Sequence, residues 1–177
     1  MENKKAQLTP KEIVVFAMLG SILFLSKLLM EWAPNIHLVG MLIMVYTLVY
    51  RKKAIIPLYL YVFLMGLFYG FATWWVPYLY IWTVLWAVTM LLPKNMPKKI
   101  AIPVYMAVCG LHGLCYGILY APAQALLFGL NFKGMLTWIA AGFVFDALHG
   151  LGNLAAGILI IPLSSLLTKL EKGLKKA

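Results

Sequence analysis

The sequence predicts an all-α integral membrane protein that crosses the bilayer six times. Of its 177 residues, 64% are hydrophobic and only 11% are charged. A soluble domain has about 45–50% apolar and about 25% charged residues. The apolar residues also gather in runs close to the roughly 20 residues that a helix needs to cross a bilayer. These observations exclude an ordinary soluble domain and a disordered chain.

Six apolar runs follow one another along the chain. Backbone polar groups in lipid must be satisfied internally, so each run is expected to be a helix, and the alternating pattern of a β-barrel is not seen. The second run is short, and the last is long enough to tilt or to extend into the cytoplasm. Because no linker, low-complexity tract or internal repeat interrupts the chain, residues 1–177 are expected to form a single membrane domain. The runs are Ile13–Met30, Ile36–Tyr50, Ala54–Phe71, Trp74–Leu92, Ile100–Tyr120 and Met135–Leu167.

The basic residues predict that both ends of the chain are cytoplasmic. With the N-terminus inside, 13 of the 15 Lys and Arg residues fall at the inner ends of the helices, as the positive-inside rule requires. This distribution does not fit a nucleic-acid-binding face, so no nucleic acid is expected as a partner. The first run is expected to be a retained helix because no small-residue cleavage site follows it. The inner basic residues are Lys4, Lys5, Lys11, Arg51, Lys52, Lys53, Lys94, Lys98, Lys99, Lys169, Lys172, Lys175 and Lys176.

The sixth helix carries polar side chains whose burial in a membrane costs free energy. At 100° per residue, Asp146, His149 and Asn153 fall within an arc of about 60°. Intramembrane ionisable residues are functional candidates because their burial is costly. Two interpretations remain open: the three side chains bind a substrate, or they bond neighbouring helices and lock the bundle.

Aromatic residues are dense where the fourth helix begins at the outer surface. Trp74, Trp75 and Tyr78 open this helix, and Trp82 lies about two turns inside. Such residues commonly form an interfacial belt in membrane proteins. Their rings could equally stack on a flat ligand or attract a cation, so all four are candidates for substrate binding.

Four further candidates lie in the fifth helix and in the outer connections. His112 and Tyr116 share a face of the fifth helix with Cys109, and His37 lies near the first outer connection. Gln124 lies in the outer connection 121–133, whose apolar residues suggest a lid that packs down on the bundle. No ligand pair has the tight spacing of a zinc motif, so no metal and no other cofactor is expected. Buried, inert thiols are expected for both cysteines.

The motifs of common enzymes are missing from the chain. No Walker A loop, His-Glu-x-x-His or Gly-x-Ser-x-Gly pattern occurs, so the protein is expected neither to hydrolyse ATP nor to be an enzyme. In the first helix, Ala17 and Ser21 have the spacing of small residues that lets another helix approach closely. They are candidates for docking a partner subunit.

The chain as a whole resembles the substrate-binding S component of energy-coupling factor (ECF) vitamin transporters. The shared features include its size and six helices with both ends inside. The late stretch from Phe145 to Asn153 also looks like this family, with Ile161-Pro162-Leu163 and a basic tail after it. The early segments Pro34–Leu38 and Tyr46–Lys53 look similar as well.

The resemblance implies a division of labour between subunits. An S component binds a vitamin or related micronutrient from outside, whereas a transmembrane coupling subunit and two ATPases power its release. The family docks through an Ala-xxx-Ala patch on the first helix; Ala17 matches it and Ser21 replaces the second alanine. The Met-x-His start of the nickel and cobalt branch is missing here. The thiamine branch keeps a carboxylate in the aromatic stretch of the fourth helix, and this chain has none there.

The sequence therefore favours a high-affinity substrate-binding subunit of an ECF-type uptake transporter in a prokaryotic plasma membrane. A standalone small carrier or channel is the main alternative, and a membrane-embedded enzyme is a weaker one. In the favoured interpretation the polar groups of the sixth helix orient the substrate while the aromatic rings stack on it. The sequence does not indicate which micronutrient is bound.

Overall fold

The described part of the chain is built from helices and short connections. The computed structural model describes residues 8–94 and 96–176, and these contain no β-strand. Three short 3₁₀ helices, Arg51–Ala54, Thr73–Trp75 and Gly157–Leu159, join longer helices to their neighbours. The α-helices are α1 (Pro10–Leu29), α2 (Val39–Tyr50), α3 (Ile55–Tyr69), α4 (Tyr78–Leu91), α5 (Lys98–Leu114), α6 (Tyr116–Phe128), α7 (Phe132–Ala156) and α8 (Ile160–Lys176).

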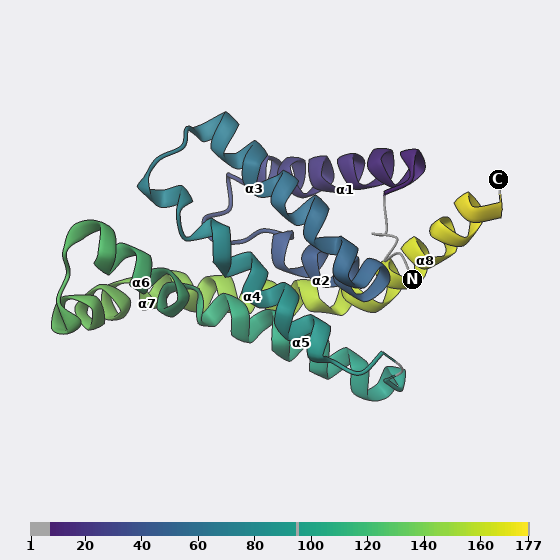
Figure 1. Ribbon diagram of the computed structural model, residues 1–177. Helices are drawn as coiled ribbons and strands as arrows, with labels where there is room; N and C mark the ends of the chain where they lie inside the picture. Colours follow the sequence, from purple (N-terminus) through teal and green to yellow (C-terminus); the bar gives the residue numbers. More distant parts are fainter. Residues whose placement is uncertain (1–7, 95, 177) are drawn as a thin grey trace, which may run out of the picture.

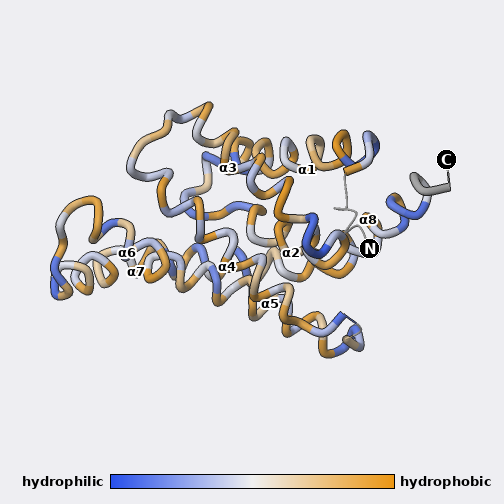
Figure 2. The backbone as a smooth tube through the Cα atoms, in the orientation of Figure 1, coloured by the Kyte–Doolittle hydropathy of each residue, from blue (hydrophilic) through white to orange (hydrophobic). Residues whose placement is uncertain are grey.

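The described residues contain five helical stretches that are long and apolar enough to cross a membrane. This indicates a membrane protein. Figure 2 shows hydrophobic residues along these helices and hydrophilic residues gathered towards their ends. The sequence predicts six spans, whereas five stretches are found here, since α2 and α3 make one stretch through a 3₁₀ turn. The stretches are Pro10–Leu29, Val39–Tyr69, Thr73–Leu91, Lys98–Phe128 and Phe132–Gly173.

The start of α1 and the end of α8 lie at the same end of the molecule (Figure 1). The turn between α2 and α3 and the connection between α4 and α5 lie there too. We call this the basic end, because it carries Arg51, Lys52, Lys53, Lys94 and Lys98. Two lysines of the expected inner set, Lys4 and Lys5, lie outside the described residues.

Helix α2 is a short inner helix rather than a full span of lipid-facing residues. The expected run Ile36–Tyr50 begins as a helix only at Val39, and the connection before it turns at Asn35, whose φ of 59° is left-handed. Its 12 residues extend for about 18 Å, whereas the hydrocarbon core is about 30 Å thick. Nine consecutive residues of α2 are buried, so it packs at the centre against α4, α5 and α8.

The expected helix Ile100–Tyr120 is broken, which corrects the sequence prediction. Helix α5 ends at Leu114 and α6 begins at Tyr116, with Cys115 between them outside regular helical geometry. The side chain of Asp146 accepts the Gly117 backbone N–H, so a bond from α7 satisfies the new helix start. Most of the expected loop 121–133 is consequently helical, as the second half of α6.

The expected helix Met135–Leu167 is longer than predicted and changes its geometry near a proline. It spans α7, a 3₁₀ turn over Gly157–Leu159, and α8. Pro162 lacks the N–H that an uninterrupted α-helix would bond to residue 158, which accounts for the tighter turn just before it. Gly157 also lies against the backbone of Met106, with 2.7 Å between an ideal Cβ at Gly157 and the Met106 Cα.

Candidate ligand-binding site

Three buried histidines meet in the interior of the helix bundle, together with two aromatic residues. His37 comes from the connection between α1 and α2, His112 from α5 and His149 from α7. The ring centroids of His37 and His149 lie 4.6 Å apart, and those of His149 and Tyr116 lie 4.9 Å apart. Trp82 of α4 completes the group, with its centroid 5.6 Å from His112 and 5.9 Å from His37. We call these five residues the histidine cluster.

The polar stripe of α7 faces this interior, as its spacing predicts. Asp146, His149 and Asn153 are 8%, 3% and 0% exposed, whereas apolar neighbours such as Val144 and Leu151 are 66% and 64% exposed. In a soluble helix this pattern would be inverted, but here the apolar face can meet lipid. The face of α7 that carries Asp146, His149 and Asn153 therefore points inward.

Asn153 occupies a narrow space between helices α2 and α5. An ideal Cβ at Gly40 would lie 3.2 Å from the Asn153 amide nitrogen, and one at Gly113 would lie 2.8 Å from it. The same ideal Cβ at Gly113 would also lie 2.8 Å from the backbone oxygen of His149. Gly113 thus lets α5 and α7 approach closely, and both glycines leave room for the Asn153 amide beside the histidine cluster.

Several polar atoms of this region are buried and have no hydrogen-bond partner within the described residues. His112 Nε2 lies 3.1 Å from the Ile81 backbone oxygen, but its Nδ1 has no partner. A buried donor or acceptor without a partner costs about 1–3 kcal/mol. Six such atoms lie in one region, where they could take part in further hydrogen bonds. They are His37 Nδ1, His112 Nδ1, His149 Nε2, Trp82 Nε1, and Asn153 Nδ2 and Oδ1.

Asp146 differs from its two neighbours on the stripe because its carboxylate already has a partner. Both oxygens lie 3.1 Å from the Gly117 backbone nitrogen, at the first turn of α6. A negative charge at the N-terminus of a helix is favourable, because unpaired N–H groups point towards it. Of the two interpretations left open by the sequence, this bond supports helix locking for Asp146.

The aromatic residues at the start of α4 form a chain of ring contacts that leads from the cluster. The Tyr78 ring lies 5.8 Å from Trp82, and the Trp74 ring lies 5.4 Å from Tyr78 in an edge-to-face arrangement. Trp75 is tied to α3 by a 2.7 Å bond from its Nε1 to the Val62 backbone oxygen. Gln124 is half-buried on α6 and has no ring contact or hydrogen bond with the histidine cluster in the described residues.

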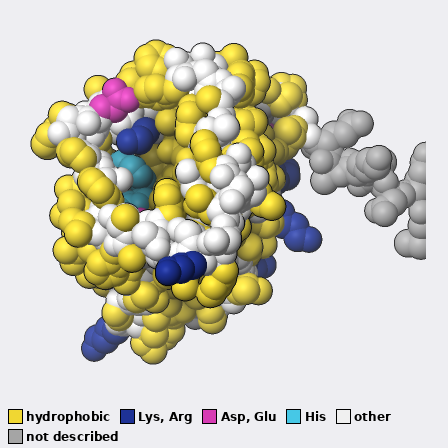
Figure 3. Space-filling model, turned by 90° about the vertical axis from the view of Figure 1, so that its left-hand side faces the viewer, with side chains coloured by type: hydrophobic (Ala, Val, Ile, Leu, Met, Phe, Trp, Pro, Cys, Tyr) yellow, Lys and Arg dark blue, Asp and Glu magenta, His cyan; other side chains and the backbone are white. Residues whose placement is uncertain are grey.

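The cluster is approached from the end of the molecule opposite the basic end. Figure 3 looks onto this end and shows histidine side chains recessed in a hollow, beside a basic and an acidic side chain. Lys27 of α1 acts electrostatically on His37, His149 and Glu31. Glu31 in turn accepts a hydrogen bond from the Tyr69 hydroxyl, which ties the α1–α2 connection to the end of α3.

His37 is neutral at physiological pH. Burial lowers the pKa of its imidazole well below 6.5, and the neighbouring His149, Lys27 and His112 lower it further. A neutral imidazole offers one donor and one acceptor nitrogen. His37 can therefore orient a polar ligand by hydrogen bonding without adding a charge to the interior.

No group of three or more His, Cys, Asp or Glu side chains in the described residues has an arrangement that could hold a metal ion. Cys109 is buried and Cys115 is half-buried, and both are free. The geometry favours hydrogen bonding and ring stacking as the chemistry of the site.

No family model, curated protein or solved structure matches this chain. The site is therefore interpreted from its own residues.

Sequence reasoning missed two residues that border the cluster. The Tyr61 ring of α3 is fully buried and lies 6.1 Å from Trp82, but nothing distinguishes this tyrosine within its apolar run. Lys27 could have been identified from the sequence, because burying a lysine within an apolar run costs free energy unless its charge is paired or reaches water.

The two proposed docking residues lie on the surface of α1. Ala17 and Ser21 are both exposed, one turn apart. The Ser21 hydroxyl donates a 3.0 Å bond to the Ala17 backbone oxygen, so it presents little polar surface to a neighbouring helix.

Proposed function

We propose that the protein is the substrate-binding subunit of an ECF-type uptake transporter for a vitamin or related micronutrient. The observation that carries this proposal is the set of six unpartnered, buried polar atoms among aromatic rings. Such a set fits a ligand pocket, in which apolar walls enclose the ligand and a few polar groups orient it. The whole-chain resemblance drawn from the sequence supplies the transporter class.

The chemistry of the cluster favours a small flat ring that carries hydrogen-bonding groups. Trp82 and Tyr116 provide stacking surfaces, and the histidines and Asn153 provide directional donors and acceptors. The cluster rings already contact one another, so binding requires them to separate. In this proposal the connection that carries His37 moves, because it lies at the open end, and the Glu31–Tyr69 hydrogen bond is released or moves with it.

The remaining subunits of the proposed transporter supply the energy. A transmembrane coupling subunit and two ATPases would use ATP, whereas this chain would bind and release the substrate in a prokaryotic plasma membrane. In this proposal the chain needs no cofactor and catalyses no reaction. The exposed Ala17 and Ser21 surface of α1 is where the coupling subunit would dock.

Native mass spectrometry of the purified chain tests whether it retains a small molecule. Quenching of tryptophan fluorescence by B-group vitamins, nucleobases and pterins then measures affinity. We expect His149→Ala and Asn153→Ala each to weaken binding at least about tenfold, which corresponds to about 1.4 kcal/mol or one lost hydrogen bond.

Two tryptophan variants of α4 distinguish the loss of a cluster side chain from a general loss of stability. Trp82→Phe changes the cluster, whereas Trp86→Phe removes a 3.2 Å bond to the Arg51 backbone oxygen and some core packing outside it. We expect the first variant to weaken binding and the second to retain it. Unchanged affinity in His149→Ala, Asn153→Ala and Trp82→Phe would overturn the site. Uptake into liposomes by the chain alone would favour a carrier, and turnover of the ligand would favour an enzyme.

A further inference from the structure

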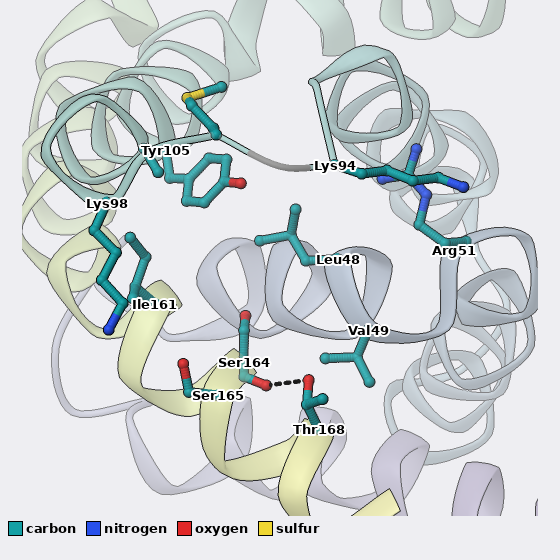
Figure 4. A pocket seen from close by; sticks show the side chains of 12 residues that line it. Leu48, Val49, Arg51, Lys94, Lys98, Tyr105, Ile161, Ser164, Ser165 and Thr168 are labelled. Carbon is teal, nitrogen blue, oxygen red and sulfur yellow. Dashed lines mark hydrogen bonds between the residues drawn. The ribbon is translucent and has the colours of Figure 1, made fainter. Parts of the chain in front are cut away.

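A second polar region, far from the histidine cluster, lies at the basic end of the molecule. It is a cavity of about 600 Å³ between the end of α2, the α4–α5 connection, the start of α5 and one face of α8. Figure 4 shows Arg51 and Lys94 on one wall and Lys98 on the other. Its lining residues are Leu48, Val49, Arg51, Lys94, Met96, Lys98, Ala101, Tyr105, Ile161, Ser164, Ser165 and Thr168.

The charged side chains that line this cavity are all positive. Three basic residues line it, and none of the described lining residues is acidic. Two acidic side chains of the basic end are engaged elsewhere: Glu12 pairs with Lys53, and Glu171 interacts with Tyr50. The positive charge within the cavity is therefore not neutralised by the described side chains.

Two buried polar atoms of the cavity lack a partner within the described residues. Arg51 donates a 2.7 Å bond from Nη2 to the Met90 backbone oxygen, which holds the guanidinium in place, but its buried Nη1 is unpaired. The Ser164 Oγ is also buried and unpaired. The Tyr105 hydroxyl points into the cavity in Figure 4, and the charge of Arg51 acts on it.

The start of α5 adds further positive charge to the cavity. Helix N-termini carry a partial positive charge and favour anions. Here no side chain caps the helix, no acidic residue occupies its first turn, and Lys98 is its first residue. A lysine at this position is unfavourable by itself and becomes favourable when an anion bridges it to the helix end.

We propose that this cavity binds the phosphate ester group of an anionic ligand, either a phospholipid headgroup or a soluble phosphate. Arg51 and Lys98 would hold the phosphate oxygens, and Ser164 and Tyr105 would contribute hydroxyl bonds. The apolar lining residues, among them Leu48 and Ile161, suit the glycerol and first acyl carbons of a lipid. Basic pockets between membrane helices commonly bind anionic headgroups.

The test compares anionic and zwitterionic lipid on the purified chain in neutral detergent. Thermal denaturation and microscale thermophoresis are measured with phosphatidylglycerol, phosphatidylcholine or inorganic phosphate, at matched ionic strength. We expect phosphatidylglycerol to raise the denaturation temperature and phosphatidylcholine to leave it unchanged. If inorganic phosphate displaces phosphatidylglycerol, the phosphate group alone is sufficient and a soluble ester is the ligand. If it does not, the lipid is the ligand.

Two double variants separate the cavity from general surface charge. Lys94→Gln/Lys98→Gln removes two lining charges, whereas Lys52→Gln/Lys99→Gln removes two exposed charges that do not line the cavity. All four side chains are exposed, so both variants should fold. We expect the first to weaken phosphatidylglycerol binding at least about tenfold and the second by less than about twofold. Ser164→Ala should weaken binding without changing the charge.

Equal weakening in the two double variants would overturn the proposal, because it would indicate attraction to the basic surface as a whole. The absence of any preference for phosphatidylglycerol or phosphate over phosphatidylcholine and chloride would overturn it as well.

Discussion

The carboxylate of Asp146 accepts the Gly117 backbone N–H with both oxygens 3.1 Å from the nitrogen. This bond joins the middle of α7 to the first turn of α6, where the helix would otherwise present an unpaired N–H. It also explains why Gly117 is a glycine, since an ideal Cβ there would collide with Asp146 Oδ2. One acidic residue within a span thus fixes where the preceding helix breaks.

Replacing Asp146 should therefore affect stability more than ligand specificity. Asp146→Ala leaves the buried Gly117 N–H unpaired, so we expect a loss of about 1–3 kcal/mol in the free energy of unfolding. Asp146→Asn keeps one acceptor oxygen and should lose less. Thermal denaturation in detergent, followed by circular dichroism, measures both. If Asp146→Ala retained full stability and lost only ligand affinity, the carboxylate would be a ligand contact rather than a helix lock.

The close approach of α5 and α7 gives a second prediction. Gly113→Ala would place a Cβ 2.8 Å from both the Asn153 amide nitrogen and the His149 backbone oxygen. Overpacking of this kind costs about 1–3 kcal/mol, and it would also displace Asn153 from the cluster. Gly142→Ala on α7 is the matched control, because no atom lies within 4 Å of its ideal Cβ.

We expect Gly113→Ala to lower both the denaturation temperature and the ligand affinity. Gly142→Ala should lower neither, since alanine is favoured over glycine within a helix. Equal effects of the two substitutions would show that the crossing of α5 and α7 tolerates a methyl group and is less tight than its geometry indicates.

The inward stripe of α7 was predictable because helical periodicity does not depend on tertiary contacts. The spacing of Asp146, His149 and Asn153 places them on one face in any α-helix. Their burial follows because polar groups avoid lipid. The convergence of His37 and His112 on this stripe could not be derived in the same way, since they come from other elements and depend on how the helices pack.

The errors in the predicted helices have identifiable physical causes. Hydropathy is averaged along the chain, so it detects neither the break at Cys115 nor the late start of α2 at Val39. The break is stabilised by a side chain 29 residues away from Gly117. Pro162 was visible in the sequence, but a proline within an apolar run predicts a local irregularity and not its form.

The neutral state of His37 predicts how stability varies with pH. Burial lowers its pKa in the folded protein well below 6.5, whereas in the denatured chain its pKa is near 6.5. Between these two values the denatured state binds more protons than the folded state. The contribution of His37 to stability should consequently be constant above about pH 7 and fall as the pH decreases below about 6.5.

The variant His37→Gln should reduce this acid sensitivity, because glutamine does not titrate. Denaturation temperatures measured between pH 8 and pH 5 should decline less steeply in this variant than in the native chain. Trp86→Phe, which changes no titratable group, should keep the native slope. Identical slopes for His37→Gln and the native chain would indicate that His37 has an ordinary pKa and is accessible to water.

The last prediction concerns assembly, and it rests on the proposed function. Ala17 and Ser21 present a small, exposed surface on α1, so a tryptophan at either position would keep a partner helix at a distance. Ala17→Trp and Ser21→Trp should abolish co-purification with a coupling subunit. Substrate binding should be retained, because neither residue belongs to the histidine cluster. Met18→Trp, also exposed on α1 but already large, is the control that should co-purify normally. Co-purification of all three variants would place the docking surface elsewhere, whereas loss of substrate binding in Ala17→Trp would show that α1 had been displaced as a whole.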